Sequence, residues 1–226
     1  MRKSLTGLSS MATRRILDAL TQRYEASSGT NAAIKAMGGV DAAKLVRAGE
    51  PADIIILASG VMAQLEAEGL VVAGSVKAFA RSGMAIAVQA GAEKPDIGGE
   101  DAVRRAVATA RKVAYSTGPS GDHLLKLCER WGIPADQLVK APPGVPVGSL
   151  VADGQAELGF QQLSELIHVA GIEVIGPLPA EIQAETIFAA GISITSSQQG
   201  DTADLIAFLT SPETDEVKRA EGMAPA

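Results

Sequence analysis

The feature that most constrains the fold of this chain is a regular alternation of strand-like and helix-like segments. The clearest strand is ADIIILA at residues 52–58, a continuous apolar run of the kind found in strands that are buried on both faces. The helix-like segments carry apolar residues on one face, as at residues 11–28, where Ile16 and Leu20 share a side. Strands that alternate with amphipathic helices predict an α/β fold whose sheets are mostly parallel.

The alternation runs through the whole chain of 226 residues. We expect further strands at residues 31–39, 82–91 and 156–160, and helices at residues 40–51, 59–72, 98–112 and 120–131. Parallel sheets bind ligands just outside the carboxyl ends of their strands, so a binding site is expected in the turns at those ends.

Small and amide-bearing residues gather in the turns after five predicted strands, three of those above and two shorter ones at residues 4–10 and 113–117. The turns are Leu8 to Ser10, Met37 to Gly39, Ser59 with Gly60, Ser116 to Gly121, and Gln161 with Gln162. Ser10, Ser59 and Ser120 stand where a helix N-cap would stand, and their hydroxyls are equally able to bind a ligand. The turn from Ser116 to Gly121 is either an ordinary turn or an anion cradle, because the first turn of a helix leaves backbone N–H groups without internal partners.

Composition excludes several classes of protein. A net charge of −6 and an aromatic content of 3% argue against a nucleic-acid-binding surface. No stretch reaches the roughly 20 apolar residues that cross a bilayer, so we expect no membrane insertion. His, Cys, Asp and Glu show no metal-ligand spacing and no phosphate-binding glycine motif is present, so we expect no metal and no cofactor. Cys128 is the single cysteine, lies at an apolar spacing, and is predicted to be a buried core thiol.

Three segments together resemble the molybdate-binding-protein family. They are VRAGEPADIIILAS at residues 46–59, YSTGPSG at 115–121 and VGSLVADGQAELGF at 147–160. Members of this family are type II periplasmic binding proteins, in which a ligand lies in the cleft between two α/β lobes, each a mostly parallel sheet flanked by helices. The resemblance implies one lobe from residues 1–80 with 190–226, a second lobe from residues 81–189, and closure about a hinge.

The turns and the resemblance together give a set of candidate ligand contacts. They are Ser9, Ser10, Gly38, Gly39, Ser59, Ser116, Thr117, Ser120, Gly121, Val147, Gln161 and Gln162. Two positions depart from the family pattern, because glycines stand where molybdate binders have a further hydroxyl and a glutamine stands where a tyrosine is usual. Glycine enlarges the pocket and an amide both donates and accepts, so a larger ligand is expected, a di- or tricarboxylate. The same features resemble the branch of the family that includes aconitate isomerase.

Two functions remain open at this point. The first is a solute-binding protein that binds a small anion and, if exported, hands it to an ABC transporter permease. The second is an aconitate-isomerase-like enzyme that moves a proton and a double bond in an unsaturated tricarboxylate, for which Asp41, His123 and Tyr115 are the candidate proton carriers. Asp41 is alternatively the N-cap of the following helix, His123 a surface or structural residue, and Tyr115 a core residue. As written, the N-terminus has no signal-peptide core, which predicts a cytoplasmic protein, or a periplasmic one if a leader has been removed.

Overall fold

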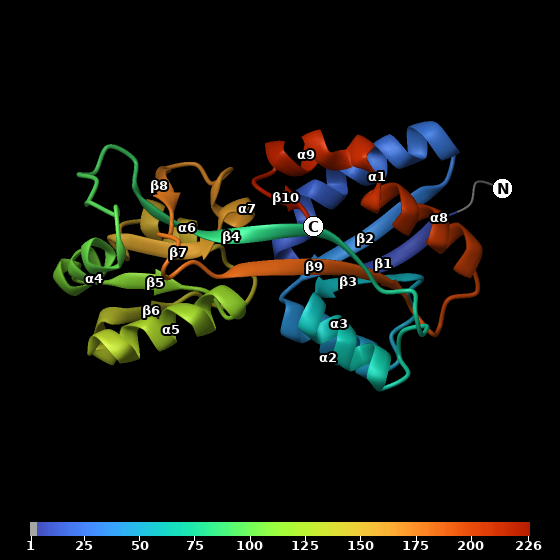
Figure 1. Ribbon diagram of the computed structural model, residues 1–226, viewed down its shortest axis with the longest axis horizontal. Coiled ribbons are helices and arrows are strands. Elements are labelled where there is room, and N and C mark those ends of the chain that lie inside the picture. The colour runs from blue at the N-terminus through green and yellow to red at the C-terminus, as the bar shows by residue number, and fades with distance from the viewer. Residues whose placement is uncertain (1–3) are drawn as a thin grey trace. The chain divides into compact units, whose positions relative to one another are not determined.

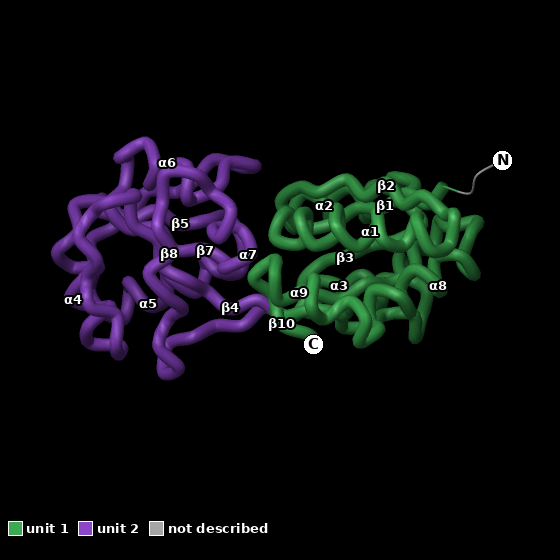
Figure 2. The backbone as a smooth tube through the Cα atoms, turned by 90° about the horizontal axis from the view of Figure 1, so that it is seen from above, with its two compact units in different colours: residues 1–81, 187–226 green, residues 82–186 purple. Residues whose placement is uncertain are grey.

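The computed structural model describes residues 4–226, and residues 1–3 lie outside the described part. The chain forms two compact units, unit 1 from residues 1–81 with 187–226 and unit 2 from residues 82–186 (Figure 2). The sequence-based lobe boundaries fall after residues 80 and 189. Two strands pass from one unit into the other, β4 (Lys77–Gln89) and β9 (Glu185–Ile192).

Unit 1 is built from both ends of the chain (Figure 1). Besides part of β4 and β9, its strands are β1 (Ser4–Ser10), β2 (Asn31–Met37), β3 (Ile54–Ala58) and β10 (Ala224–Pro225). Its helices are α1 (Arg14–Ser28), α2 (Gly39–Arg47), α3 (Ser59–Ala67), α8 (Gln199–Thr210) and α9 (Asp215–Ala220), with single 3-10 turns at Met11–Thr13 and Pro212–Thr214. β1 pairs in parallel with β2 and β3, and β9 pairs antiparallel with β3.

Helices cover both faces of the unit 1 sheet (Figure 1). Ile54 and Ile56 of β3 pack against α1, α8 and α9, whereas Ile55 and Leu57 pack against α2 and α3. Successive side chains of a strand point to opposite faces, so a strand between two helical layers needs apolar residues at every position. The prediction that residues 52–58 contain a strand buried on both faces is confirmed.

Unit 2 is built from the middle of the chain (Figure 1). Besides part of β4 and β9, its strands are β5 (Val113–Tyr115), β6 (Leu138–Lys140), β7 (Leu158–Gln162) and β8 (Ile172–Pro177). Its helices are α4 (Glu100–Thr109), α5 (Pro119–Trp131), α6 (Val147–Ala152) and α7 (Leu163–Leu166), with a 3-10 turn at Ala135–Gln137. β6 and β7 pair in parallel with β5, and β4 pairs antiparallel with β7 and β8.

The core of unit 2 also has layers on two faces of its sheet. α4 and α5 pack on one face through residues such as Val103 and Leu124, which meet Phe160 of β7. α6 packs on the other face, where Val151 meets Ala114 of β5. Cys128 of α5 belongs to the first layer and is 1% exposed, and burial raises the pKa of its thiol to about 11. The prediction of a core thiol is therefore confirmed.

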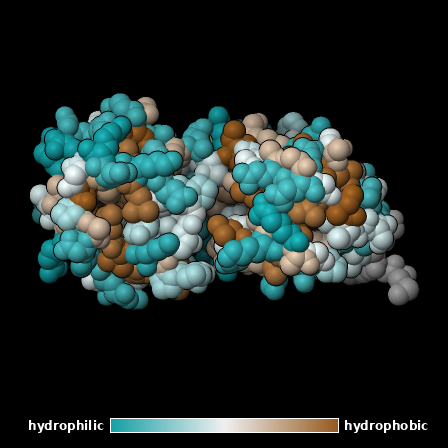
Figure 3. All heavy atoms as spheres, turned by 90° about the horizontal axis from the view of Figure 1, so that it is seen from below, coloured by the Kyte–Doolittle hydropathy of each residue, from teal (hydrophilic) through white to brown (hydrophobic). Residues whose placement is uncertain are grey.

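The surface carries polar side chains with small apolar patches between them on the face of each unit shown in Figure 3. Within residues 4–226, no helix combines the length and the apolar character needed to span a bilayer. The strands that are followed directly by helices run parallel within each unit. β9 runs antiparallel to β3, and β4 runs antiparallel to β7. The α/β fold expected from the sequence is confirmed.

Some boundaries differ from the sequence prediction. Gln161 and Gln162 were expected in a turn but form the last two residues of β7, where they pair with β4 and are 4% and 3% exposed. Ser120 was expected as a possible N-cap, but the cap is Gly118, because Pro119 takes the first helical position, where its missing N–H costs nothing. Ser59 likewise lies inside α3, after an extended cap at Ala58.

Candidate functional site

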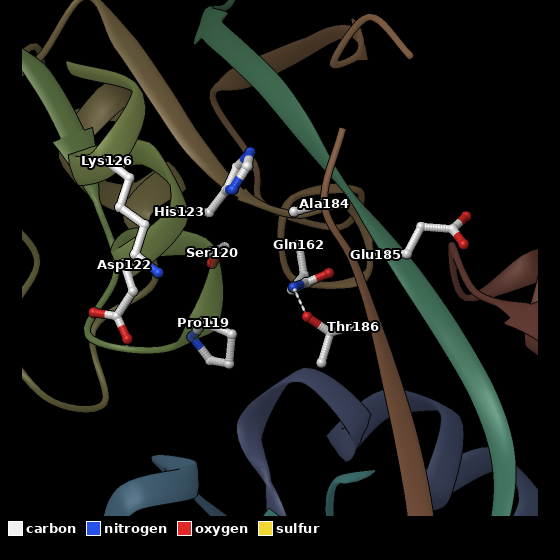
Figure 4. Close-up of a pocket in the computed structure, with 9 residues that line it drawn as sticks. All are labelled: Pro119, Ser120, Asp122, His123, Lys126, Gln162, Ala184, Glu185 and Thr186. Carbon is white, nitrogen blue, oxygen red and sulfur yellow. Dashed lines mark hydrogen bonds between the residues drawn. The ribbon is translucent and has the colours of Figure 1, made fainter. Parts of the chain in front are cut away.

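A pocket of 330 Å³ lies in unit 2 (Figure 4). Its walls come from α5 between Pro119 and Lys126, from Gln162 at the end of β7, and from residues 184–186 at the start of β9. This volume falls at the lower end of the range for small-molecule sites, about 300–1,000 Å³. It can therefore hold a small organic ligand.

The pocket lies at the carboxyl edge of the parallel strands. Tyr115, the last residue of β5, pairs with Phe160 of β7 and with Lys140 of β6. Gln161 and Gln162 therefore extend past the end of β5, level with the turn that begins at Ser116. This is the edge at which sheets of this kind bind ligands, as the sequence analysis expected.

The turn that leads into α5 is held together by its own hydroxyls. Ser116 Oγ lies 2.9 Å from Ser120 Oγ, and the Gly118 N–H donates to Ser116 Oγ at 3.4 Å. Gly121 must be glycine here, because a Cβ at this position would lie 1.9 Å from the Ser116 carbonyl oxygen. Thr117 is exposed on the same turn. The structure thus brings these predicted contacts together at the start of a helix of 13 residues, beside the pocket that Ser120 lines.

Gln162 lines the pocket, and its side-chain amide is incompletely hydrogen-bonded. Its Nε2 donates to Thr186 Oγ1 at 2.7 Å, as Figure 4 shows. Its Oε1 is buried and has no hydrogen-bond partner among the described residues. Because the Thr186 hydroxyl both donates and accepts, the amide can rotate by about 180° and offer the pocket N–H donors instead. The residue can therefore satisfy either an acceptor or a donor on a ligand.

Ionisable side chains complete the pocket. His123 and Lys126 project from α5 along one wall, and the carboxylates of Asp122 and Glu185 also line the pocket (Figure 4). His123 Nε2 lies 2.8 Å from the Ile182 carbonyl oxygen, which can only accept, so Nε2 carries a hydrogen and Nδ1 is the remaining basic nitrogen. Tyr115 instead packs beside the core layer of α4 and α5. These surroundings agree with the alternative considered from the sequence, in which Tyr115 is a core residue.

Gln161 points away from this pocket and connects two other elements. The backbone N–H of Val147, the first residue of α6, donates to Gln161 Oε1 at 2.9 Å. The other end of the amide, Nε2, donates to Glu165 Oε1 at 2.8 Å. Burial raises the pKa of the Glu165 carboxyl to about 7, and the hydrogen bond from Gln161 opposes this shift. Sequence reasoning missed Glu165, because the contact joins the end of a strand to the helix that follows it and no helical spacing signals it.

The remaining predicted contacts belong to unit 1. Ser9 is fully buried at the end of β1, and its Oγ has no hydrogen-bond partner among the described residues. Ser10 follows it, and a Cβ on Gly39 would lie 3.8 Å from Ser10 Oγ, so this hydroxyl faces the start of α2. Neither serine makes a side-chain capping bond, in contrast to the alternative considered from the sequence. Gly38 is the N-cap of α2.

Asp41 also lies in unit 1. It stands in the first turn of α2, after the Gly38 cap, so the expectation that it caps the helix is wrong. Its Oδ1 lies 3.5 Å from Lys44 Nζ, and 53% of its side chain is exposed. Among residues 4–226, no cluster of three or more His, Cys, Asp or Glu is arranged to hold a metal ion.

Comparisons with known proteins agree with this architecture. The family of bacterial extracellular solute-binding proteins matches residues 5–224. An aconitate isomerase from Pseudomonas sp. is 35% identical over 232 residues, which cover 98% of this chain and 88% of that protein. The periplasmic molybdate-binding protein of Azotobacter vinelandii superposes with a TM-score of 0.80 at 19% identity, over 97% of this chain and 98% of that one.

A further structural relative is the substrate-binding domain of a molybdenum ABC transporter protein from Clostridium difficile. It has a TM-score of 0.75 and 17% identity, and the match covers 99% of both chains. These two structures show the fold, which is that of molybdate-binding-like type II periplasmic binding proteins. The family match and the 35% identical relative establish the family as well as the fold. This chain belongs to the bacterial extracellular solute-binding protein family.

Proposed function

We propose that this protein binds a small carboxylate-bearing anion, a di- or tricarboxylate, as a solute-binding protein. The observation that carries the proposal is the Gln162 amide, which is buried at the wall of the pocket with one end unsatisfied. A buried polar atom without a partner costs about 1–3 kcal/mol, and a ligand that supplies the partner recovers this free energy. Gln162 can bond to either oxygen or hydroxyl groups of such a ligand.

The size of the pocket favours an organic carboxylate over a compact oxyanion. The lining holds one basic side chain, Lys126, together with the acidic Asp122 and Glu185, so the positive end of the α5 dipole next to Ser120 is the element that favours a carboxylate. Lys126, Ser120 and Gln162 all line the pocket, so one ligand with several carboxylates can contact more than one of them. As a receptor, the protein would hand such a ligand to an ABC transporter permease after export to the periplasm.

A thermal-shift series tests the proposal. The protein is melted alone and with citrate, cis-aconitate, trans-aconitate or molybdate, because a ligand that binds the folded state raises the melting temperature. We expect one or more of the carboxylates to stabilise the protein, and the substitution Gln162→Leu to remove the effect. Stabilisation by molybdate with none by the carboxylates would contradict the proposal.

A second candidate function is the interconversion of aconitate isomers in the cytoplasm. Two observations favour it, the 35% identity with an aconitate isomerase and a carboxyl group in unit 2 whose pKa is close to neutral. Proton NMR of cis-aconitate incubated with the protein tests it directly. We expect signals of trans-aconitate to grow at a rate proportional to protein concentration. Binding without interconversion would contradict the isomerase function and support only the receptor function.

A further inference from the structure

The pocket of unit 2 has exposed charged side chains and buried uncharged ones. Its charged side chains, Asp122, Lys126 and Glu185, are all exposed. The carboxylates of Asp122 and Glu185 point away from each other on opposite sides of the pocket (Figure 4). Ser120 and Gln162, in contrast, are only 3% exposed. A ligand group that reaches the buried part of the lining therefore meets uncharged hydrogen-bonding groups.

Two acceptor atoms of the lining have no hydrogen-bond partner among residues 4–226. One is the buried Gln162 Oε1. The other belongs to His123, whose half-buried ring is held by the bond between Nε2 and the Ile182 carbonyl oxygen at 2.8 Å. Nε2 carries the hydrogen of that bond, so Nδ1 of the neutral ring is left as an acceptor. A carboxylate satisfies neither atom, because its oxygens only accept.

Hydroxyl hydrogens of the same lining are also unused. Thr186 Oγ1 accepts from Gln162 Nε2 at 2.7 Å, and its own hydrogen has no acceptor among the described residues. The Oγ atoms of Ser116 and Ser120 lie 2.9 Å apart, and this bond uses one of their two hydrogens. An ammonium group, which only donates, would leave these hydroxyl hydrogens without an acceptor. The lining can thus both donate and accept, and a hydroxyl group on the ligand matches it because a hydroxyl does both.

The Gln162 amide strengthens the case for a hydroxyl. In the orientation of the structure its oxygen is unsatisfied, because Nε2 bonds to Thr186. If the amide rotates by about 180°, Thr186 donates to the oxygen and the nitrogen is unsatisfied instead. A ligand carboxylate can bond to the unsatisfied end in the rotated orientation alone. A ligand hydroxyl can do so in both, as an acceptor or as a donor.

We propose that this pocket selects a hydroxy-polycarboxylate, a di- or tricarboxylate that also carries a hydroxyl group, and that Gln162 and Thr186 recognise the hydroxyl. The inference rests on the carboxylate binding proposed above and narrows its ligand class. The carboxylates of the ligand lie near Lys126 and the positive end of the α5 dipole, and the hydroxyl lies against the buried part of the lining. An analogue without the hydroxyl leaves the buried groups unpaired, which is how a polar site rejects it.

Citrate and tricarballylate (propane-1,2,3-tricarboxylate) test the proposal, because they carry the same three carboxylates and differ by the hydroxyl of citrate. Isothermal titration calorimetry gives the Kd of each, and we expect citrate to bind at least about 10-fold more tightly. Malate and succinate, which also differ by one hydroxyl, repeat the comparison for a dicarboxylate. Equal affinities within a pair that binds would overturn the hydroxyl preference and leave carboxylate binding intact. A protein that binds neither pair and no aconitate would end both proposals.

The substitution Thr186→Val removes the hydroxyl and keeps the branched shape of the side chain. We expect it to weaken citrate binding about 10-fold and tricarballylate binding less than about 3-fold, whereas Thr186→Ser should keep the preference for citrate. Lys126→Gln is the matched comparison, because it removes an exposed charge of the same pocket and should weaken both ligands by a similar factor. A Thr186→Val variant that weakens both ligands equally would overturn the role of Thr186 in recognising the hydroxyl.

Discussion

The two units end their parallel strands with different chemistry. In unit 1, this edge consists of small groups, Ser9, Ser10, Gly38 and Gly39, and the Ser9 hydroxyl has no partner among the described residues. In unit 2, the edge consists of side chains bonded in pairs, Ser116 with Ser120, Gln162 with Thr186, and Gln161 with Glu165. The same βα architecture therefore supports one edge of backbone and hydroxyl groups and another of amides and a titratable carboxyl.

The two edges differ in hydrogen bonding because their side chains differ in length. Short groups at the end of β1 and the start of α2 do not reach across to neighbouring elements, and the buried Ser9 hydroxyl has no partner among the described residues. Longer amides at the end of β7 bond to neighbouring elements, and one buried atom, Gln162 Oε1, is left without a partner among the described residues. Substitutions made in pairs, with one member at each edge or with a matched control, test this difference.

The largest expected effect comes from glycines at the two edges. Gly121→Ala should lower the free energy of unfolding by more than about 3 kcal/mol, because the new Cβ would lie 1.9 Å from the Ser116 carbonyl oxygen. Alanine normally stabilises a helix relative to glycine by about 1 kcal/mol, so the clash reverses the usual sign. Gly39→Ala, whose nearest atom would be 3.8 Å away, should change stability by less than about 0.5 kcal/mol. Urea unfolding measures both, and similar losses would contradict the difference between the edges.

The next effect is a pH dependence of stability that belongs to unit 2. The pKa of Glu165 is raised from 4.5 to about 7 in the folded protein, so folding favours its protonated form. Its contribution to stability is therefore fully present below about pH 4.5 and is lost as pH rises through about 7. Glu165→Gln, which cannot ionise, should gain up to about 3 kcal/mol relative to the unsubstituted protein between these limits.

Unfolding by urea at several pH values between 4 and 9 measures this gain. The exposed Glu129→Gln variant should track the unsubstituted protein at every pH. A constant difference between Glu165→Gln and the unsubstituted protein would show that burial does not raise the pKa of this carboxyl.

The next prediction compares two glutamines of unit 2, one expected to stabilise the fold and one expected to bind a ligand. Gln183 accepts from the Met84 N–H at 2.8 Å and donates to the Met84 and Leu178 carbonyls at 3.1 and 3.3 Å, so Gln183→Leu should cost about 2 kcal/mol of stability. Gln162 makes one side-chain bond and has one unsatisfied end, so Gln162→Leu should cost less than about 1 kcal/mol. Thermal unfolding compares them, and carboxylate binding should fail in Gln162→Leu. The opposite ranking of stabilities would contradict this assignment.

Sequence patterns predicted the α/β fold and the edge of unit 2 where the pocket lies. The continuous apolar run at 52–58 is enough to require two covering layers, and the turn from Ser116 to Gly121 marks a strand end before a helix. Both signals are local, because they depend on the order of residue types along the chain.

The parts that sequence patterns missed depend on tertiary contacts. Gln161 and Gln162 look like turn residues, but pairing with β4 extends the strand through them and buries both amides. Glu165 looks like a solvated residue of a short helix, and only the packing of α6 and β7 around α7 produces its raised pKa. Asp41 shows the converse, because a carboxylate beside a predicted ligand turn proves to be exposed and ion-paired.

The smallest expected effect tests the short groups of unit 1. Ser9→Ala should raise the free energy of unfolding by about 1 kcal/mol, because it removes a buried hydroxyl that has no partner among residues 4–226. Ser193 is the matched control in the same unit, since its Oγ lies 2.9 Å from Thr195 Oγ1 and accepts from the Thr195 N–H at 3.3 Å. Ser193→Ala should therefore lower stability by about 1 kcal/mol. Opposite signs in urea unfolding would mark Ser9 as a residue kept for a ligand, and a loss of stability in both variants would remove the distinction between the edges.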